Sequence, residues 1–190
     1  SLIRMTLTAE HQATLKKAIE ALHQRTFYAA FPEHPAPAIY GETADADGQA
    51  KFKSYLGKKF DELKQTGATG WAGQEESPDL QEALNISYPT VSVETLIDQA
   101  TRAFSTWRKR SVDDRSEILM QSLDRVKKRF FDIAYATMHT TGQGYMMAFQ
   151  ASGPHAADRA LEAIAAAYEE LNRFPAKAVW DKPMGKLNVQ

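Results

Sequence analysis

Apolar residues recur at helical spacing in four stretches of the chain. Within each stretch they fall three or four residues apart, which places them on one face of an α-helix. Thr8, Ser92 and Ser111 stand just before three of these stretches, where N-cap residues belong, and Pro154 suits the first turn of the fourth. The pattern therefore predicts four amphipathic helices. Their apolar faces comprise Leu15, Ala18, Ile19 and Leu22; Leu96, Ile97, Ala100, Phe104 and Trp107; Ile118, Leu119, Leu123, Val126 and Phe130; and Leu161, Ile164, Tyr168 and Leu171.

The third helix begins with a capping pattern over Ser111 to Asp114, and we expect it to continue or restart until Gly142. The stretches outside the four helices are less regular. Three prolines between residues 27 and 40 predict an extended linker, because proline cannot continue a helix. A shorter helix is predicted between a Thr43 cap and Gly57. Between residues 61 and 91 we expect loop, with LNISYPTV as the only possible strand.

These elements predict an all-α fold: an array of five or six amphipathic helices with a long irregular connection and an extended C-terminal tail. We interpret residues 1–4 as a leader or an added remnant, residues 5–174 as the helical region and residues 175–190 as the tail. The stretch AVWDK in the tail is a possible strand that would need a neighbour from outside the chain.

Composition and charge narrow the class of protein. The 190 residues are 43% hydrophobic, which is enough for a folded domain with its own core. Because 23 basic side chains face 24 acidic ones, the net charge of −1 favours neither nucleic acid nor an anionic membrane as a partner. The absence of cysteine excludes a disulfide, a thiolate zinc site and a cysteine nucleophile within these residues. No apolar run is long enough for a membrane span, and we expect a cytoplasmic protein.

One stretch, HTTGQGYMMAFQASGPH from His139 to His155, departs from the plain helical pattern. Glycine costs about 1 kcal/mol inside a helix but almost nothing just beyond its end, so these glycines favour a joint between two helices. The stretch contains no carboxylate, no lysine and no paired nucleophile, which argues against an active site. We therefore interpret Gly142 and Gly144 as a stop, Gly153-Pro154 as a start, and Met146, Met147 and Phe149 as filling between the helices.

Other candidate chemistry is weak. GQG lacks the third glycine and the lysine of phosphate-binding loops. No two histidines have the i, i+4 spacing of a helical zinc site, although His139 and His155 can meet across the joint. Ser152 lacks a nucleophile elbow and is interpreted as a capping hydroxyl near Pro154. The sequence thus assigns no catalytic, cofactor-binding or metal-binding residue.

Charged clusters are explained by helix ends and solvent. The acidic pairs at residues 113–114, 75–76 and 169–170 do not converge, because adjacent residues on a helix point about 100° apart, and we interpret them as solvated faces. The basic runs at residues 108–110 and 125–131 are split between two helices, which favours complementing helix dipoles over binding nucleic acid.

The stretch from about Val91 onward is similar to the leading helices of the aldehyde dehydrogenase superfamily. The motifs IYGETA, GATGW, MHTTGQGYMMAFQASGPHAADRALEA and WDKPMGK further resemble the PaaN-type aldehyde dehydrogenases, named for phenylacetic acid degradation. The superfamily positions are occupied by Trp107, Arg115, Leu119, Thr141 and Gly142.

This resemblance implies an enzyme that oxidises an aldehyde to an acid with NAD or NADP. The family's cysteine nucleophile, glutamate base, asparagine oxyanion donor and nucleotide fold lie downstream, and none has a matching position here. The resemblance therefore implies the non-catalytic N-terminal helical region of a longer enzyme, inactive alone, whose residues 175–190 lead toward a nucleotide-binding domain. Its expected partners are the cofactor and catalytic domains of the same polypeptide and further copies in a homo-oligomer.

Two alternatives remain open from the sequence. The chain can be a freestanding helical interaction module without catalytic activity. A weaker alternative is a binder of a small ligand, such as an acyl-CoA or NAD(P), that uses Met146, Met147, Phe149 and Trp107 as a pocket.

Overall fold

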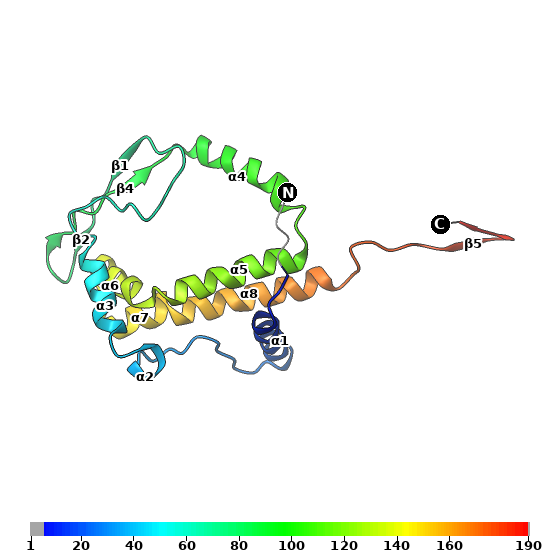
Figure 1. Ribbon diagram of the computed structural model, residues 1–190, viewed down its shortest axis with the longest axis horizontal. Helices are drawn as coiled ribbons and strands as arrows, with labels where there is room; N and C mark the ends of the chain where they lie inside the picture. Colours follow the sequence, from blue (N-terminus) through cyan, green and yellow to red (C-terminus); the bar gives the residue numbers. More distant parts are fainter. Residues whose placement is uncertain (1–5, 190) are drawn as a thin grey trace.

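The structure, a computed structural model, describes residues 6–189. Two long helices, α5 and α8, lie side by side and run in opposite directions (Figure 1). The helix α1 packs against α8, while α3, α6 and α7 gather where α5 ends (Figure 1). The helices are α1 (Ala9–Gln24), α2 (Pro37–Tyr40), α3 (Ala44–Lys53), α4 (Val93–Trp107), α5 (Val112–Lys127), α6 (Phe130–Thr141), α7 (Tyr145–Ser152) and α8 (Pro154–Asn172).

The predicted helix starts are confirmed by their caps. The Thr8 Oγ1 accepts from the amide of His11 (3.2 Å), and the Ser111 Oγ accepts from the amide of Asp114 (3.1 Å). Ser92 caps α4 in the same way. These bonds satisfy N–H groups that have no partner within the helix. The third predicted helix restarts rather than continues, since α5 ends at Lys127 and α6 begins at Phe130.

The prediction of an all-α fold is correct for most of the chain but wrong in excluding sheets. Three small antiparallel pairs are present, and strands of two or three residues are too short to show an alternating pattern in the sequence. The predicted strand LNISYPTV contributes only β4. The pairs are β1 (Gly70–Ala72) with β4 (Tyr88–Thr90), β2 (Glu76–Ser77) with β3 (Glu82–Ala83), and β5 (Lys182–Met184) with β6 (Leu187–Val189).

Two clusters of buried side chains form the core. The larger lies among α1, α5, α6, α7 and α8, and the smaller lies where α3 and α6 meet the loops of the small sheets. Burying such apolar surface is the main favourable term in folding. The larger cluster contains Leu15, Ala18, Phe31, Met120, Leu123, Phe130, Phe131, Ala134, Phe149, Ala157, Leu161 and Ala165; the smaller contains Phe52, Leu84, Ile86 and Tyr135.

The contact between α3 and α6 depends on a glycine. A Cβ atom added to Gly48 would lie 2.3 Å from the Cβ of Phe131, well inside van der Waals contact. Glycine therefore lets the two helices approach closely. Thr43 makes no side-chain cap bond, contrary to its predicted role, and α3 ends at Lys53 before a turn that reaches Gly57.

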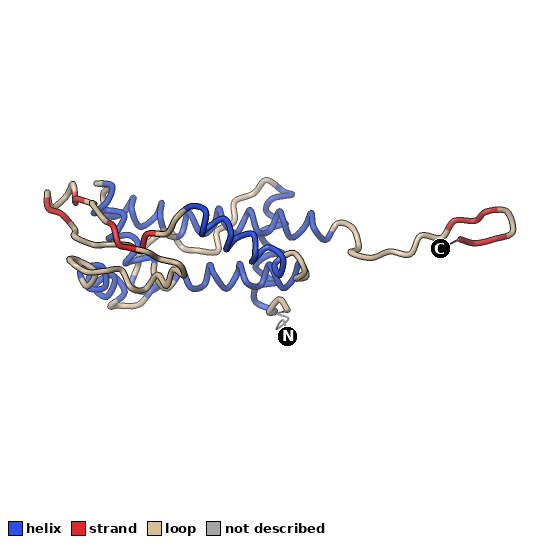
Figure 2. Tube along the Cα trace, turned by 90° about the horizontal axis from the view of Figure 1, so that it is seen from above, coloured by secondary structure: helices blue, strands red, loops and turns tan. Residues whose placement is uncertain are grey.

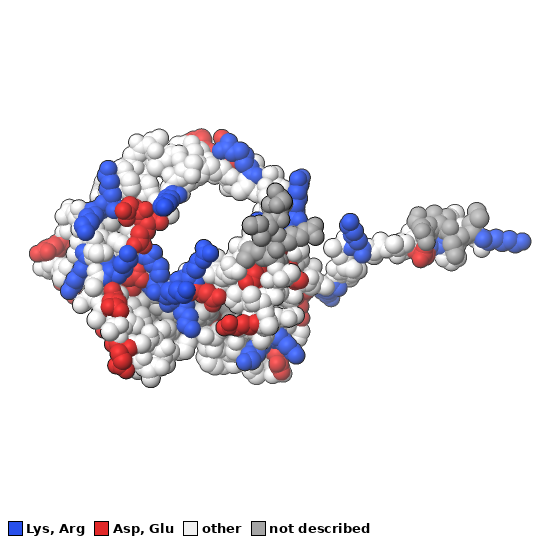
Figure 3. All heavy atoms as spheres, viewed as in Figure 1, with Lys and Arg blue, Asp and Glu red and all other residues white. Residues whose placement is uncertain are grey.

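The helix α4 stands apart from the other helices. It spans from the β1–β4 sheet to the start of α5 like an arch, and an opening separates it from α5 (Figures 1 and 3). Side-chain hydrogen bonds tie the polar side of α4 to the loop at Gln65. There the Gln99 Nε2 donates to the Thr66 carbonyl (2.9 Å), and the Gln65 Nε2 donates to the Gln99 Oε1 (3.3 Å).

The C-terminal segment extends away from the helical body (Figure 2). Val179 and Trp180 are exposed in it. The stretch AVWDK forms no strand before Lys182, where β5 begins, and β5 pairs with β6 of the same chain. Among the described residues, no helix is long and apolar enough to cross a membrane.

Candidate functional site

A cleft of about 900 Å³ lies between α2 and α3 on one side and the junction of α5 and α6 on the other. The first turn of α1 also contributes to the lining of the cleft, through Glu10. The cleft is lined by both apolar and charged side chains. Its lining consists of Glu10, Ile39, Tyr40, Thr43, Ala44, Asp47, Gly48, Lys51, Asp124, Lys127, Lys128, Arg129, Phe131 and Asp132.

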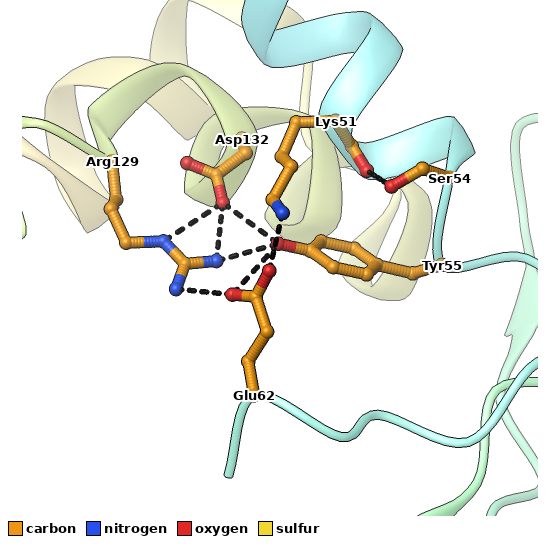
Figure 4. Close-up of polar contacts among 6 residues, drawn as sticks. All are labelled: Lys51, Ser54, Tyr55, Glu62, Arg129 and Asp132. Carbon is orange, nitrogen blue, oxygen red and sulfur yellow. Dashed lines mark hydrogen bonds and ion pairs between the residues drawn. The ribbon is translucent and has the colours of Figure 1, made fainter.

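At the edge of this cleft, five charged and polar side chains form one network (Figure 4). The Nη2 of Arg129 donates to the Asp132 Oδ2 (2.7 Å) and to the Tyr55 Oη (2.6 Å). The Nη1 of Arg129 pairs with the Glu62 Oε2 at 2.6 Å, and Lys51 pairs with the other oxygen of Glu62. Two cations thus face two carboxylates. The network ties α3, the loop at Glu62 and α6 together.

The contacts of this network shift the pKa values of Glu62, Arg129 and Tyr55. Hydrogen bonding from Lys51 lowers the pKa of Glu62, and the Arg129 guanidinium contributes to the same shift. The hydrogen bond to Asp132 raises the pKa of Arg129. Burial raises the pKa of Tyr55, so the phenol stays neutral. Each charge already has a partner, so we assign the network a structural rather than an acid–base role.

A second polar cluster joins α1 to α5. The Nδ1 of His11 lies 2.8 Å from the Glu117 Oε2, and its Nε2 lies 2.8 Å from the Asp124 Oδ2. Because both ring nitrogens face carboxylates, the arrangement suits a doubly protonated imidazolium. Burial by itself lowers the pKa of His11, but the hydrogen bonds to Glu117 and Asp124 outweigh it and raise that pKa. No pattern in the sequence signals this cluster, because its partners lie more than 100 residues apart.

A third cluster holds α7 against α3. The phenols of Tyr135 and Tyr145 both donate to the Asp45 Oδ1. Burial, followed by the nearby carboxylate, raises the pKa of Tyr135 to about 12. The pKa of Tyr145 is raised for the same reasons. Phenols with such pKa values remain hydrogen-bond donors at neutral pH and are poor general bases.

The histidines that a metal site would need are not brought together. His139 is buried, where its ring stacks on Phe52 with 4.8 Å between centroids and its Nδ1 lies 3.0 Å from the Ser77 Oγ. His155 is exposed and lies 3.4 Å from a Glu33 oxygen. Within residues 6–189, no group of three or more His, Asp or Glu side chains converges on a possible metal position.

The joint predicted between His139 and His155 is confirmed in its outline. Gly142 ends α6 with a left-handed φ of 75°, and Pro154 opens α8 after Gly153. The predicted filling is only partly correct. Phe149 is buried in the core, but Met146 and Met147 lie on the surface.

These positions also separate the side chains of the predicted ligand pocket. The two methionines are exposed on α7 while Trp107 lies at the far end of α4, so they do not enclose a common cavity with the buried Phe149 (Figure 1). Ser152 is not a cap of α8, contrary to the prediction. Its hydroxyl donates to the Ala148 carbonyl within α7.

The charged runs differ in part from the prediction. Arg125 and Lys127 lie in the last turn of α5, as helix-dipole complementarity requires. Residues 108–110 instead lie just beyond α4, where the Arg110 Nη1 pairs with both carboxylate oxygens of Asp114. Asp114 is buried, so the prediction that its acidic pair forms a solvated face is wrong for this residue.

Comparison with known proteins decides the family. The model of the aldehyde dehydrogenase family matches residues 85–188, which is more than half of the chain. The chain belongs to the aldehyde dehydrogenase family. Within it, α4 to α8 fall in the part that the family model describes, and we call residues 85–188 the family segment. Residues 6–84, which carry α1 to α3, precede the match, and we call them the leading segment.

One solved structure resembles nearly the whole chain. It is the crystal structure of an NAD-dependent aldehyde dehydrogenase from Burkholderia multivorans, with a TM-score of 0.89 and 46% sequence identity. The match covers 96% of this aldehyde dehydrogenase chain and 33% of that enzyme, so the chain spans about a third of the enzyme's length. The leading segment is therefore included in the likeness. A search of the curated proteins finds no match.

The described residues do not fit a dinucleotide. A dinucleotide site needs a parallel sheet with a glycine-rich turn between a strand and a helix. Here the strand pairs β1–β4, β2–β3 and β5–β6 are all antiparallel, and the glycine-rich joint at Gly142 follows a helix. We therefore derive no chemical step through NAD from these residues.

Proposed function

We propose that this chain is the N-terminal, non-catalytic helical region of a longer, cytoplasmic aldehyde dehydrogenase that oxidises an aldehyde to an acid with NAD or NADP. We further propose that this enzyme is of the PaaN type, associated with phenylacetic acid degradation. The family of the chain, and its 46% identity to part of an NAD-dependent enzyme, support the general reaction. The four motifs quoted above support the narrower type.

The observation that carries this proposal is the exposed apolar face of α4. Val93 is 64% exposed, and Ile97 and Phe104 are each 59% exposed. No residue of α4 is buried. A surface helix normally turns such a face toward a core, so this face is best explained as a docking surface for the downstream part of the same polypeptide.

In this proposal the residues of this chain position and support the rest of the enzyme. The reacting groups belong to its cofactor and catalytic domains. Residues 5–174 form the supporting region, and residues 175–190 lead toward the nucleotide-binding domain. The extended arm with its β5–β6 hairpin supports a second part of the proposal, that the enzyme is a homo-oligomer. Arms of this kind have backbone edges available for pairing with another chain.

Sequencing the gene beyond Gln190 tests the proposal directly. A reading frame that continues into a nucleotide-binding fold and a later cysteine is the expected result. A stop codon at that point would instead establish the alternative, a freestanding helical interaction module.

A kinetic assay gives an independent test. The purified 190-residue chain is incubated with aliphatic and aromatic aldehydes and with NAD or NADP, and reduced nicotinamide is followed at its absorbance band. We expect no turnover. Steady reduction that scales with the concentration of the chain would contradict a non-catalytic role.

A further inference from the structure

The 900 Å³ cleft exists because the leading segment packs on the family segment. One wall consists of α2 and α3, with Thr43, Asp47 and Lys51. The other consists of the end of α5 and the start of α6, from Asp124 to Asp132. The cleft is therefore a feature that the family segment does not form by itself, and it lies apart from the apolar face of α4.

Among the described residues, some charged side chains of the cleft have an ion-pair partner and others have none. Asp124 is held by His11, and Asp132 is held by Arg129. In the part of the chain that the structure describes, Lys127 and Lys128 have no carboxylate within ion-pair distance. Both are exposed at the end of the cleft where α5 ends and the positive end of the α6 dipole begins. Figure 3 shows basic side chains gathered on this face where α5 ends, near α3.

The lining of the cleft is not uniformly basic, because two further carboxylates belong to it. Glu10 and Asp47 also line the cleft. Glu10 lies in the first turn of α1, beside His11, which binds Asp124. Because Lys51 pairs with Glu62 and Arg129 pairs with Asp132, an anionic group in the cleft would be held by Lys127 and Lys128.

One part of the cleft lining is apolar. Ile39 is half-exposed there, and Tyr40 packs edge-on against Phe131 with 5.4 Å between ring centroids. Ala44 adds to the same surface. A cleft that joins an apolar part to charged groups can hold a small molecule by both kinds of contact.

We propose that this cleft binds a small amphiphilic anion, with its phosphate or carboxylate group between Lys127 and Lys128 and its apolar portion on Ile39, Tyr40 and Ala44. The ammonium groups supply charge-assisted hydrogen bonds to the oxyanion. Contact with Ile39, Tyr40 and Ala44 removes the apolar portion of the ligand from water. Its occupancy would tie the leading segment more firmly to the family segment.

The proposal is tested by titrating the ¹⁵N-labelled chain with four probes and following amide chemical shifts. Phenyl phosphate and benzoate carry the same ring with a phosphate or a carboxylate. Phenol carries the ring without the charge, and inorganic phosphate the charge without the ring. We expect phenyl phosphate, benzoate or both to shift amides in residues 39–51 and 124–132, more strongly than either half-probe does.

Matched variants locate the two ends of the site. The double substitution K127E/K128E should weaken binding of the aromatic anion by about tenfold or more, since hydrogen bonds to charged groups contribute that much. The control K16E/K17E reverses the same charges at another adjacent, exposed pair on α1 and should leave binding unchanged. Ile39→Ser should weaken phenyl phosphate but not inorganic phosphate.

The outcomes separate cleanly. Binding of phenyl phosphate alone, of benzoate alone or of both anions supports the site and identifies the preferred oxyanion. Equal shifts by phenol, equal losses in K127E/K128E and K16E/K17E, or no shifts in residues 39–51 and 124–132 with any probe would each overturn it. Circular dichroism of every variant confirms that the helices are retained.

Discussion

The helices α4 and α8 have the same kind of amphipathic sequence but opposite surroundings. On α8, Ala157, Leu161 and Ala165 are buried against α1 and α5. On α4, the corresponding stripe from Val93 to Phe104 lies on the surface. The spacing of apolar residues therefore tells which face of a helix avoids water, but not which part of the molecule covers that face. In this chain, α8 finds its cover among described residues, and α4 does not.

The largest expected effect comes from truncating an aromatic side chain in the buried core that α8 helps to form, compared with truncating one on α4. Phe149→Ala removes a fully buried ring that packs against Phe131, and should lower the free energy of unfolding by about 3–5 kcal/mol. Phe104→Ala, on α4, should change it by less than about 0.5 kcal/mol. Urea unfolding followed by circular dichroism measures both. Equal losses would show that the face of α4 is buried in solution.

The second effect tests how closely the leading segment packs on the family segment. Gly48→Ala places a Cβ atom 2.3 Å from the Cβ of Phe131, so α3 must move away from α6. We expect a loss of about 1–3 kcal/mol in the free energy of unfolding. The control is Gly144→Ala, where nothing lies within 4 Å of the added atom and the change should be below about 1 kcal/mol, the cost of placing alanine at an N-cap. A Gly48→Ala variant as stable as the control would contradict the close helix contact.

The third effect is a pH dependence that arises where α1 meets α5. The raised pKa of His11 means that its contribution to stability is fully present below its unfolded pKa of about 6.5 and is lost as pH rises through the folded value. Stability should therefore decline above pH 6.5, by at most about 1.4 kcal/mol per pH unit. His11→Gln should remove this component, while His34→Gln, at an exposed histidine, should retain it. Urea midpoints measured between pH 6 and 9 give the slope, and a slope unaltered in His11→Gln would exclude His11 as its source.

The smallest effect on folding comes from a charge on the α4 face, although its effect on association is large. Ile97→Asp should change the free energy of unfolding by less than about 0.5 kcal/mol, because the side chain is exposed. We expect the chain to self-associate at high concentration through this face, and Ile97→Asp to reduce the association. Light scattering compares the two proteins. A wild-type chain that remains monomeric at high concentration would contradict the expectation.

Local signals in the sequence were sufficient for most helix boundaries. Thr8, Ser92 and Ser111 cap the helices that they were expected to cap, because an N-cap acts on amides only two or three residues away. Gly142 ends α6 for a similarly local reason. The small sheets were missed, since pairing of two-residue or three-residue strands depends on tertiary contacts rather than on pattern.

The polar clusters and the cleft were not predictable in the same way. His11 meets Glu117 across 106 residues, and Arg129 meets Tyr55 across 74. No local spacing encodes such pairs, because they arise only when the leading segment folds onto the family segment. The basic run near Lys127 is visible in the sequence, but Lys127 and Lys128 form a candidate site only because α3 supplies the opposite wall.

The amide contacts of Gln99 fix more than the position of α4. An α-helix turns by about 100° for each residue, so inserting one residue between Ser92 and Gln99 would rotate the remainder of the helix by more than a quarter turn. Either the bonds of Gln99 to Gln65 and the Thr66 carbonyl would break, or Phe104 would swing toward a new direction. The loop at Gln65 thus fixes the rotation of α4 about its own axis. We expect α4 to tolerate substitutions along its outer side far better than any change in its length.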